Sequence, residues 1–422
     1  MTRLFGRMFA RLAGGLNISQ LGADPLRPDI FVEIDYMGSS GGAVPHDHRP
    51  DPDALEALRK KFDDHGINLH IDAGIPGFDL SADALAGGEV LPHQSVLVVD
   101  LGSFGAEAFG HVMDAIEDIK ATHFNRNRCN VFHYCVWVHG LWSVRNPETM
   151  LLEDSTTTGI AQEVCTDDFI VSLWVHAGGS GSPVEQAGTF MHELGHTLHL
   201  EHGGFQLLNC KPNYRSVMNY RYQLDGVDVS CCGGVPAPFC CDALGDGSED
   251  MNGVVLNIDY SGEMLPTLNE ACLNEAAGIC GGVGIDWNQQ FGTQSCSIPQ
   301  GCGAQCVEFN ISADPSIGAC TDCRSLLDGQ ILQSFDDWEH LWFDFKHCPS
   351  KENCGRPSKA GNGLDDDLDG IVDEDCLVEN CTNDIDDDGD CRIDAMDPDC
   401  GGGEGGGGGS VTYIIPESLR CR

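Results

Sequence analysis

Hydrophobic and polar positions follow two different periods in the first half of the chain. Short apolar runs bounded by polar or turn residues predict buried strands. They lie at Ile30–Ile34, Asn68–Ile71, Val96–Val99, Val131–His139 and Phe169–His176. Apolar residues at steps of three and four predict helices over Asp53–Asp64 and Glu107–Ala121. Strands mixed with helices predict an α/β or α+β arrangement, and we take α+β as the expected class.

The segment Ser182–His199 has the clearest helical pattern of the chain. Ser182 can cap its first turn, Pro183 suits the first helical position, and Glu185 completes a capping box. Apolar residues at steps of three and four along the segment predict that one face packs into a core. The histidines of the segment then lie on the adjacent face.

Downstream of His202 the pattern changes, because turns, glycines and cysteines dominate. We expect this part to be irregular and held by disulfides, with a helical or mixed stretch near Asp336–Phe345 at its end. Two copies of an Asp-rich motif follow at a spacing of 21 residues, Asn362–Asp373 and Asn383–Asp394. Residues 401–410 form a glycine-rich linker by composition.

The charge of the chain narrows its possible partners. A formal net charge of -43 comes from 66 acidic and 23 basic residues, and residues 361–400 alone hold 16 acidic side chains. Nucleic acids and anionic membrane surfaces attract positive charge, so we expect neither as a partner. Calcium is the natural counter-ion. No apolar run reaches the roughly 18 residues of a membrane span, so we expect no integral membrane segment.

The 22 cysteines indicate the cellular compartment in which the protein folds. They are too many for a reducing environment unless they bind metal, and most lack the paired spacing of zinc ribbons. We therefore expect disulfides and a secreted, extracellular or cell-surface protein. A signal peptide has an uninterrupted apolar run, but arginines interrupt every apolar run of the first residues, MTRLFGRMFARLAGGL. These residues therefore conflict with the expected secretion. The cysteines carry more weight.

The sequence HELGHTLHLEH at 192–202 contains the candidate chemistry. On a helix, positions i and i+4 lie on one face, so His192 and His196 can bind one ion. Glu193 follows the first ligand and can reach a water molecule on that ion. A catalytic zinc site usually has three protein ligands, so a third must be found.

His199 and His202 are the candidates for the third ligand. On a continued helix, His199 would lie about 10 Å along the axis from His192, too far for one ion. If the chain turns near His199, His202 can swing back to the metal, and Gly203 and Gly204 indicate that a loop has begun. A site completed by His199, or by a downstream glutamate as in another clan of zinc peptidases, remains an alternative.

The pattern HExxHxxxxxH, followed by Ser216-Val217-Met218-Asn219-Tyr220, resembles the metzincin superfamily of zinc proteases. The resemblance covers roughly residues 29–345, although its specific motifs occupy only 192–220. It implies a zinc-dependent endopeptidase with a mixed sheet, an active-site helix and an irregular lower half. It also implies zinc ligands at His192, His196 and His202, and Glu193 as the general base.

Two more positions take roles from this resemblance, and one departs from it. Met218 corresponds to the methionine of the turn beneath the metal. Tyr220 matches a tyrosine that acts as an extra ligand or transition-state donor in astacin-like and pappalysin-like enzymes. His199 stands where the family has a glycine, at a position expected to need positive φ.

The resemblance also predicts how a substrate binds. An extended protein or peptide substrate would add as a strand along the edge of Phe169–His176. The departure at His199 and the acidic repeats leave a second functional class open. In it the chain is a weakly active or inactive binding or adhesion protein of the same fold, stabilised by calcium.

The acidic repeats are similar to calcium loops. Alternating carboxylates can wrap a hard cation, although neither copy has the final glutamate of an EF-hand. The candidate calcium ligands are Asp365, Asp367, Asp369, Asp373, Asp386, Asp388, Asp390 and Asp394. His46 and His48 could bind a metal, but an ordinary polar loop before Pro50 is the favoured interpretation.

These patterns divide the chain into four parts. We expect a leader or N-terminal extension at 1–28 and a protease domain at 29–345, with an upper subdomain at 29–202 and a lower one at 203–345. Calcium-binding-type repeats at 346–400 and a glycine-rich linker with a short tail at 401–422 follow.

Overall fold

The structure is a computed structural model of the whole chain. It describes residues 16, 18–39, 46–80, 87–99, 106–146, 148–161, 166–227, 257–262, 264–269, 273–274, 306–307 and 331–343. The two acidic repeats and the glycine-rich linker lie outside these residues. No helix of the described part is both long and apolar enough to cross a membrane.

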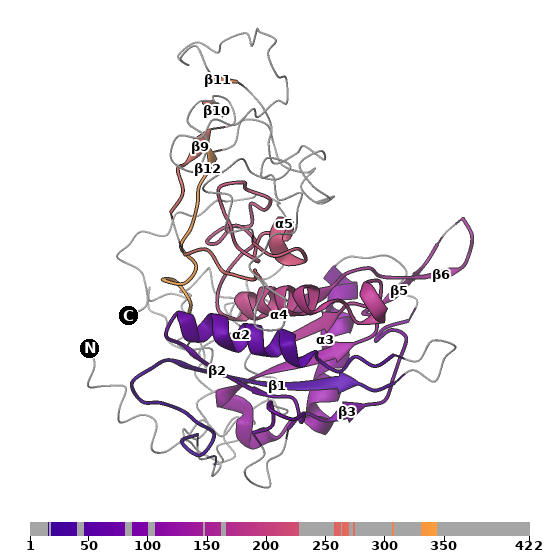
Figure 1. Cartoon of the computed structure of the whole chain (residues 1–422). Helices are drawn as coiled ribbons and strands as arrows, with labels where there is room; N and C mark the ends of the chain where they lie inside the picture. Colours follow the sequence, from indigo (N-terminus) through magenta and orange to yellow (C-terminus); the bar gives the residue numbers. More distant parts are fainter. Residues whose placement is uncertain are drawn as a thin grey trace, which may run out of the picture.

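A six-stranded, mostly parallel sheet forms the centre of the molecule (Figure 1). Its strands are β1 (Asp29–Met37), β2 (Asn68–Asp72), β3 (Val90–Leu91), β4 (Phe132–Val138), β7 (Gly159–Ala161) and β8 (Asp168–Ser172). The order is β2-β1-β4-β8-β7, and β3 pairs with the end of β1. Only β7 runs antiparallel to its neighbour. The chain is thus a mixed α/β protein, which is compatible with the α+β class.

Helices cover both faces of this sheet. Along β1, Ile30, Val32 and Ile34 pack with α2 (Pro52–Asp64) and α4 (Pro183–Thr197), which lie side by side (Figure 1). The alternate residues Phe31 and Met37 pack with α3 (Ala106–His123) on the other face. The strand period of two therefore sends side chains into two separate cores.

Capping residues explain where α2 and α4 start. Asp51 accepts a hydrogen bond from the backbone of Asp53 at the start of α2. Ser182 and Glu185 form the reciprocal capping box of α4, with Pro183 at the first position. Three short helical turns complete the described set: η2 (Arg126–Val131), η3 (Ala177–Gly179) and α5 (Tyr220–Gln223).

One predicted strand is absent from the structure, and one segment predicted to be helical or mixed has no helix in its described residues. Val96–Val99 forms no strand, and only Val98 makes an isolated bridge to Trp142. The described residues of Asp336–Phe345 form turns and no helix. The paired β9 (Leu268–Asn269) and β12 (Ile331–Leu332) precede them. The pair of strands β10 (Leu273–Asn274) and β11 (Cys306–Val307) was also not predicted from the sequence.

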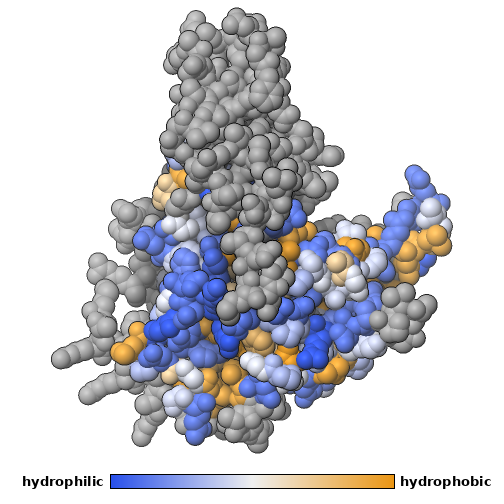
Figure 2. All heavy atoms as spheres, viewed as in Figure 1, coloured by the Kyte–Doolittle hydropathy of each residue, from blue (hydrophilic) through white to orange (hydrophobic). Residues whose placement is uncertain are grey.

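A hairpin of β5 (Ser143–Arg145) and β6 (Leu152–Asp154) projects from the body of the molecule. Met150 and Leu151 near its tip are 60% and 67% exposed, and Figure 2 shows hydrophobic atoms on this projection. This hairpin was not predicted from the sequence, because its strands are only three residues long.

The turn around Tyr214 is anchored to the last described segment by a buried carboxyl group. Asp337 is fully buried and accepts hydrogen bonds from the Tyr214 hydroxyl, at 2.8 and 2.9 Å, and from the Ser261 backbone at 3.0 Å. Burial raises the pKa of Asp337 to about 7. The folded protein therefore binds a proton here at pH values where the unfolded chain has lost it.

This shift predicts a pH dependence of stability. Because the pKa of Asp337 is raised on folding, its contribution to stability is complete below about pH 4 and is lost as the pH rises towards 7. Asp337→Asn should remove this slope, of at most about 1.4 kcal/mol per pH unit, while keeping an acceptor for Tyr214. Urea unfolding of metal-free wild type and variant across this range measures the difference. An identical slope in both proteins would contradict the assignment.

Candidate metal centre

The helix α4 and the loop after it bring three histidines together. The ligand atoms of His192, His196 and His202 all lie within 4.8 Å of one another. The Nε2 atom of His196 lies 3.2 Å from the Nε2 atoms of both His192 and His202. Zinc–nitrogen bonds of about 2.0 to 2.1 Å place tetrahedral donors about 3.3 to 3.4 Å apart. The three rings therefore nearly have the spacing of a metal site.

The other ring nitrogens fix the tautomers. His192 Nδ1 lies 2.7 Å from the carbonyl oxygen of Val217, and His196 Nδ1 lies 2.7 Å from that of Leu200. A carbonyl can only accept, so both Nδ1 atoms must donate. Burial lowers the pKa of His192 well below its usual value and that of His196 to about 3, so both rings are neutral. Each Nε2 atom then carries a lone pair and no proton.

Two lone pairs that face each other at 3.2 Å cannot form a hydrogen bond. The contact between His192 and His196 is therefore repulsive unless a cation accepts both. Backbone carbonyls that orient the second nitrogen of each ring are the usual outer partners of metal-bound histidines. These donors fit a divalent transition metal, and three nitrogens leave one position of a tetrahedral ion open.

The chain reaches this geometry through a turn at His199. This residue has φ of 78°, in the left-handed region as expected for this position, and the Leu200 backbone donates to the carbonyl of Gly195 at 2.9 Å. The chain then reverses, and His202 points back to α4. His199 stays outside the cluster, with its ring 6.3 Å from that of Trp342.

Met218 lies directly under the helix. It is fully buried, and a Cβ atom added to Gly195 would meet its sulfur at 2.2 Å. Glycine at the fourth position of HELGH therefore lets the turn approach the helix. The same turn presents the Val217 carbonyl that orients His192, so packing and ligand orientation are coupled.

Glu193 leaves α4 toward β7. A Cβ atom on Gly159 would meet its Oε1 atom at 2.5 Å, and the backbone of Ala161 donates a hydrogen bond to its carboxylate. The side chain is buried, which raises the pKa of Glu193 well above its usual value. Its carboxyl group thus lies against the last strand of the sheet.

Tyr220, at the start of α5, joins the same group of rings. Its ring centroid lies 4.4 Å from that of His202 and 5.4 Å from that of His192. The structure therefore brings His192, His196, His202 and Tyr220 together, with Met218 packed beneath α4. The carboxyl group of Glu193 lies apart from these rings, against β7, and His199 also lies outside the group. The eight predicted calcium ligands lie outside the described residues.

The expected substrate edge needs a correction. The strand predicted at Phe169–His176 is β8, and β7 pairs antiparallel with it from Phe169 to Val171. These residues already have hydrogen-bonding partners on both sides, because β4 pairs along the other. The last strand of this sheet in the described part is β7. No strand was predicted at β7, because Gly-Ile-Ala is short and lacks alternation.

A second group of histidines was not foreseen as a site. His46, His48, His93 and His139 also offer ligand atoms within 4.8 Å of one another. Only the spacing of His46 and His48 was visible in the sequence, and it was interpreted as a polar loop.

Among the described cysteines, Cys129 and Cys210 are disulfide-bonded and Cys135 is a buried thiol. No protein-family model matches the chain, and a search of curated proteins finds no match.

Proposed function

We propose that this chain is a zinc-dependent endopeptidase of metzincin type. The observation that supports it best is the contact between His192 Nε2 and His196 Nε2, whose lone pairs need a cation between them. A zinc ion held by these atoms and His202 would polarise a peptide carbonyl and lower the pKa of a water ligand.

The remaining residues have roles that follow from their positions. Glu193 is one residue from a ligand and is held beside β7, so a proton acceptor lies next to the strand where a peptide would be placed. The outer side of β7 would receive an extended substrate as a further antiparallel strand. Tyr220 lies against His202 and would donate to the polarised oxygen.

His202 and the nearby His199 provide a matched test of the metal ligands, because only His202 belongs to the cluster. His202→Ala should lose at least tenfold in zinc affinity and nearly all cleavage of a peptide library, because two nitrogens no longer hold the ion against a chelator. His199→Ala should keep both, because its ring is outside the cluster. Elemental analysis after dialysis and mass spectrometry of the peptides measure the two effects. Zinc loss on His199→Ala with full retention on His202→Ala would refute this ligand set.

Secretion and calcium binding by 361–400 remain predictions from the sequence. Calcium removal by EGTA should lower the melting temperature if the repeats act as stabilising sites. An unchanged melting temperature would count against that role.

A further inference from the structure

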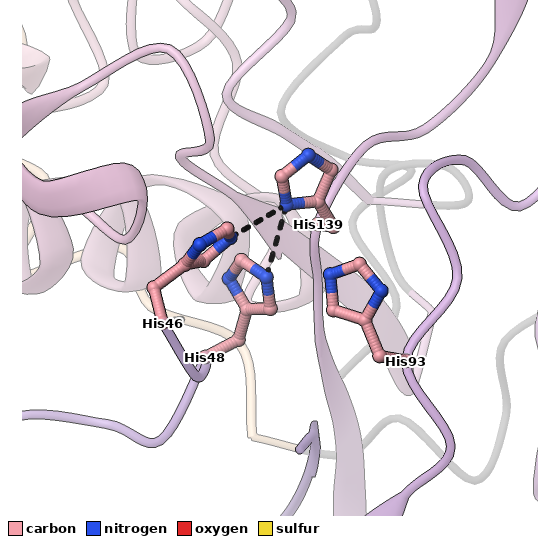
Figure 3. Close-up of side chains that lie close together, drawn as sticks. All are labelled: His46, His48, His93 and His139. Carbon is pink, nitrogen blue, oxygen red and sulfur yellow. Dashed lines mark hydrogen bonds between the residues drawn. The ribbon is translucent and has the colours of Figure 1, made fainter. Parts of the chain in front are cut away.

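Four histidines from three separate segments converge at one end of the central sheet (Figure 3). His46 and His48 lie in the loop between β1 and α2, His93 follows β3, and His139 directly follows β4. Because β3 and β4 both run parallel to β1, their carboxyl ends meet at one edge. The His48 backbone donates to the carbonyl of Met37 at 3.0 Å, which brings the loop back to the end of β1.

Hydrogen bonding within this group does not account for its geometry. His139 Nδ1 lies 3.0 Å from His46 Nε2 and 3.2 Å from His48 Nε2. A neutral ring nitrogen carries either one proton or one lone pair, so it can form one well-directed bond but not two. His93 Nε2 is buried and has no hydrogen-bond partner in the described part of the chain. A nitrogen of this ring faces the other three (Figure 3).

We propose that His46, His48, His93 and His139 form a second metal site, which binds a divalent transition metal such as zinc. The two short distances are close to the roughly 3.3 to 3.4 Å between donors around a tetrahedral zinc ion. Four imidazoles without a carboxylate suit zinc, copper or nickel and not calcium or magnesium. Asp47 does not join them, because it is exposed and accepts from the Arg49 backbone.

The state of the rings agrees with this geometry. Metal ligation needs neutral imidazoles, and burial lowers the pKa of His48 to about 3 and that of His139 to about 4. His48 is buried and the other three rings are half-buried. The ligand positions are thus shielded from water without being sealed.

Four protein ligands make a closed site, whose role is structural. The ion would join the loop at His46 to the ends of β3 and β4. The ring of His46 lies against Gly179, in the turn that precedes α4, and Asp51 donates from its backbone to Gln186 of α4 at 2.8 Å. The second site would therefore hold the segment that positions the start of the helix carrying His192 and His196.

This inference is independent of the proposed function, and its test keeps the two apart. The full chain is stripped with EDTA and reloaded with zinc, and bound metal is counted by elemental analysis. The His192→Ala/His196→Ala variant lacks the first site. It should bind one zinc more than the variant that also carries His48→Asn/His139→Asn. His111→Ala, which changes an exposed histidine of α3, should leave that zinc in place. Equal counts with and without His48 and His139 would overturn the proposal.

Cobalt(II) substitution identifies the ligands even if a variant folds poorly. In the same background, cobalt should give the visible absorption of a tetrahedral site without a thiolate charge-transfer band. His93→Gln, which changes a half-buried member of the group, should weaken cobalt binding at least tenfold while circular dichroism stays unchanged. A thiolate band, or full affinity in His93→Gln, would place the metal on cysteines or elsewhere and refute the site.

Discussion

Replacing Glu193 by glutamine is expected to lower kcat/KM for peptide cleavage by about 10² to 10⁴-fold while the bound zinc stays unchanged. Glutamine keeps the size of the side chain and can still accept from the Ala161 backbone, so the contact with β7 is preserved. It cannot take up a proton, which is the role assigned to the carboxylate. Stopped assays with a fluorogenic peptide, together with elemental analysis of the same samples, separate loss of chemistry from loss of metal.

Glu201 provides the matched control for Glu193. Burial also raises the pKa of Glu201, which lies next to His202 in the turn after α4. Unlike Glu193, it lies in a turn whose backbone pairs with Gly204, and not beside β7. Glu201→Gln should retain activity within a few-fold. If Glu193→Gln stays fully active while its zinc is retained, the chain has another base. If neither wild type nor variants cleave any peptide, the proposed peptidase activity is refuted, and the alternative of a binding protein is favoured.

The sequence predicts most of the candidate centre, because its signals are local. The i, i+4 spacing of His192 and His196, the capping box of Ser182 and Glu185, and the turn at His199 each depend on neighbours within one or two helical turns. These features follow from backbone geometry and do not need the rest of the fold.

Features that depend on distant pairing could not be predicted. The four-histidine group forms because β3 and β4 end beside β1, an arrangement that joins residues 46 and 139. No spacing in the sequence encodes it. The edge position of β7 was missed for the same reason: a three-residue strand has almost no periodic signal, and its place is decided by the neighbour with which it pairs.

The second large effect concerns a buried charge cluster that no sequence motif indicates. Arg128 is fully buried in η2 and bridges two carboxylates, Glu33 of β1 and Asp72 of β2, at 2.7 Å each. Its guanidinium also lies 4.5 Å from the ring centroid of Phe132. Above about pH 8, where Glu33 is ionised, Arg128→Met should cost about 3 to 5 kcal/mol of unfolding free energy, because both carboxylates would then remain buried without their cation. Urea unfolding monitored by tryptophan fluorescence measures it.

The pH dependence and two controls tie this loss to charge. Burial already raises the pKa of Glu33 to about 8, so the folded state favours its neutral form and the penalty grows as the pH rises. The deficit of Arg128→Met should therefore shrink in mild acid, and adding Glu33→Gln and Asp72→Asn should recover most of it. Arg59→Met, which removes an exposed pair with Glu56 on α2, should cost at most about 1 kcal/mol. A deficit that is independent of pH and persists in the triple variant would mean that Arg128 acts by packing and not by charge.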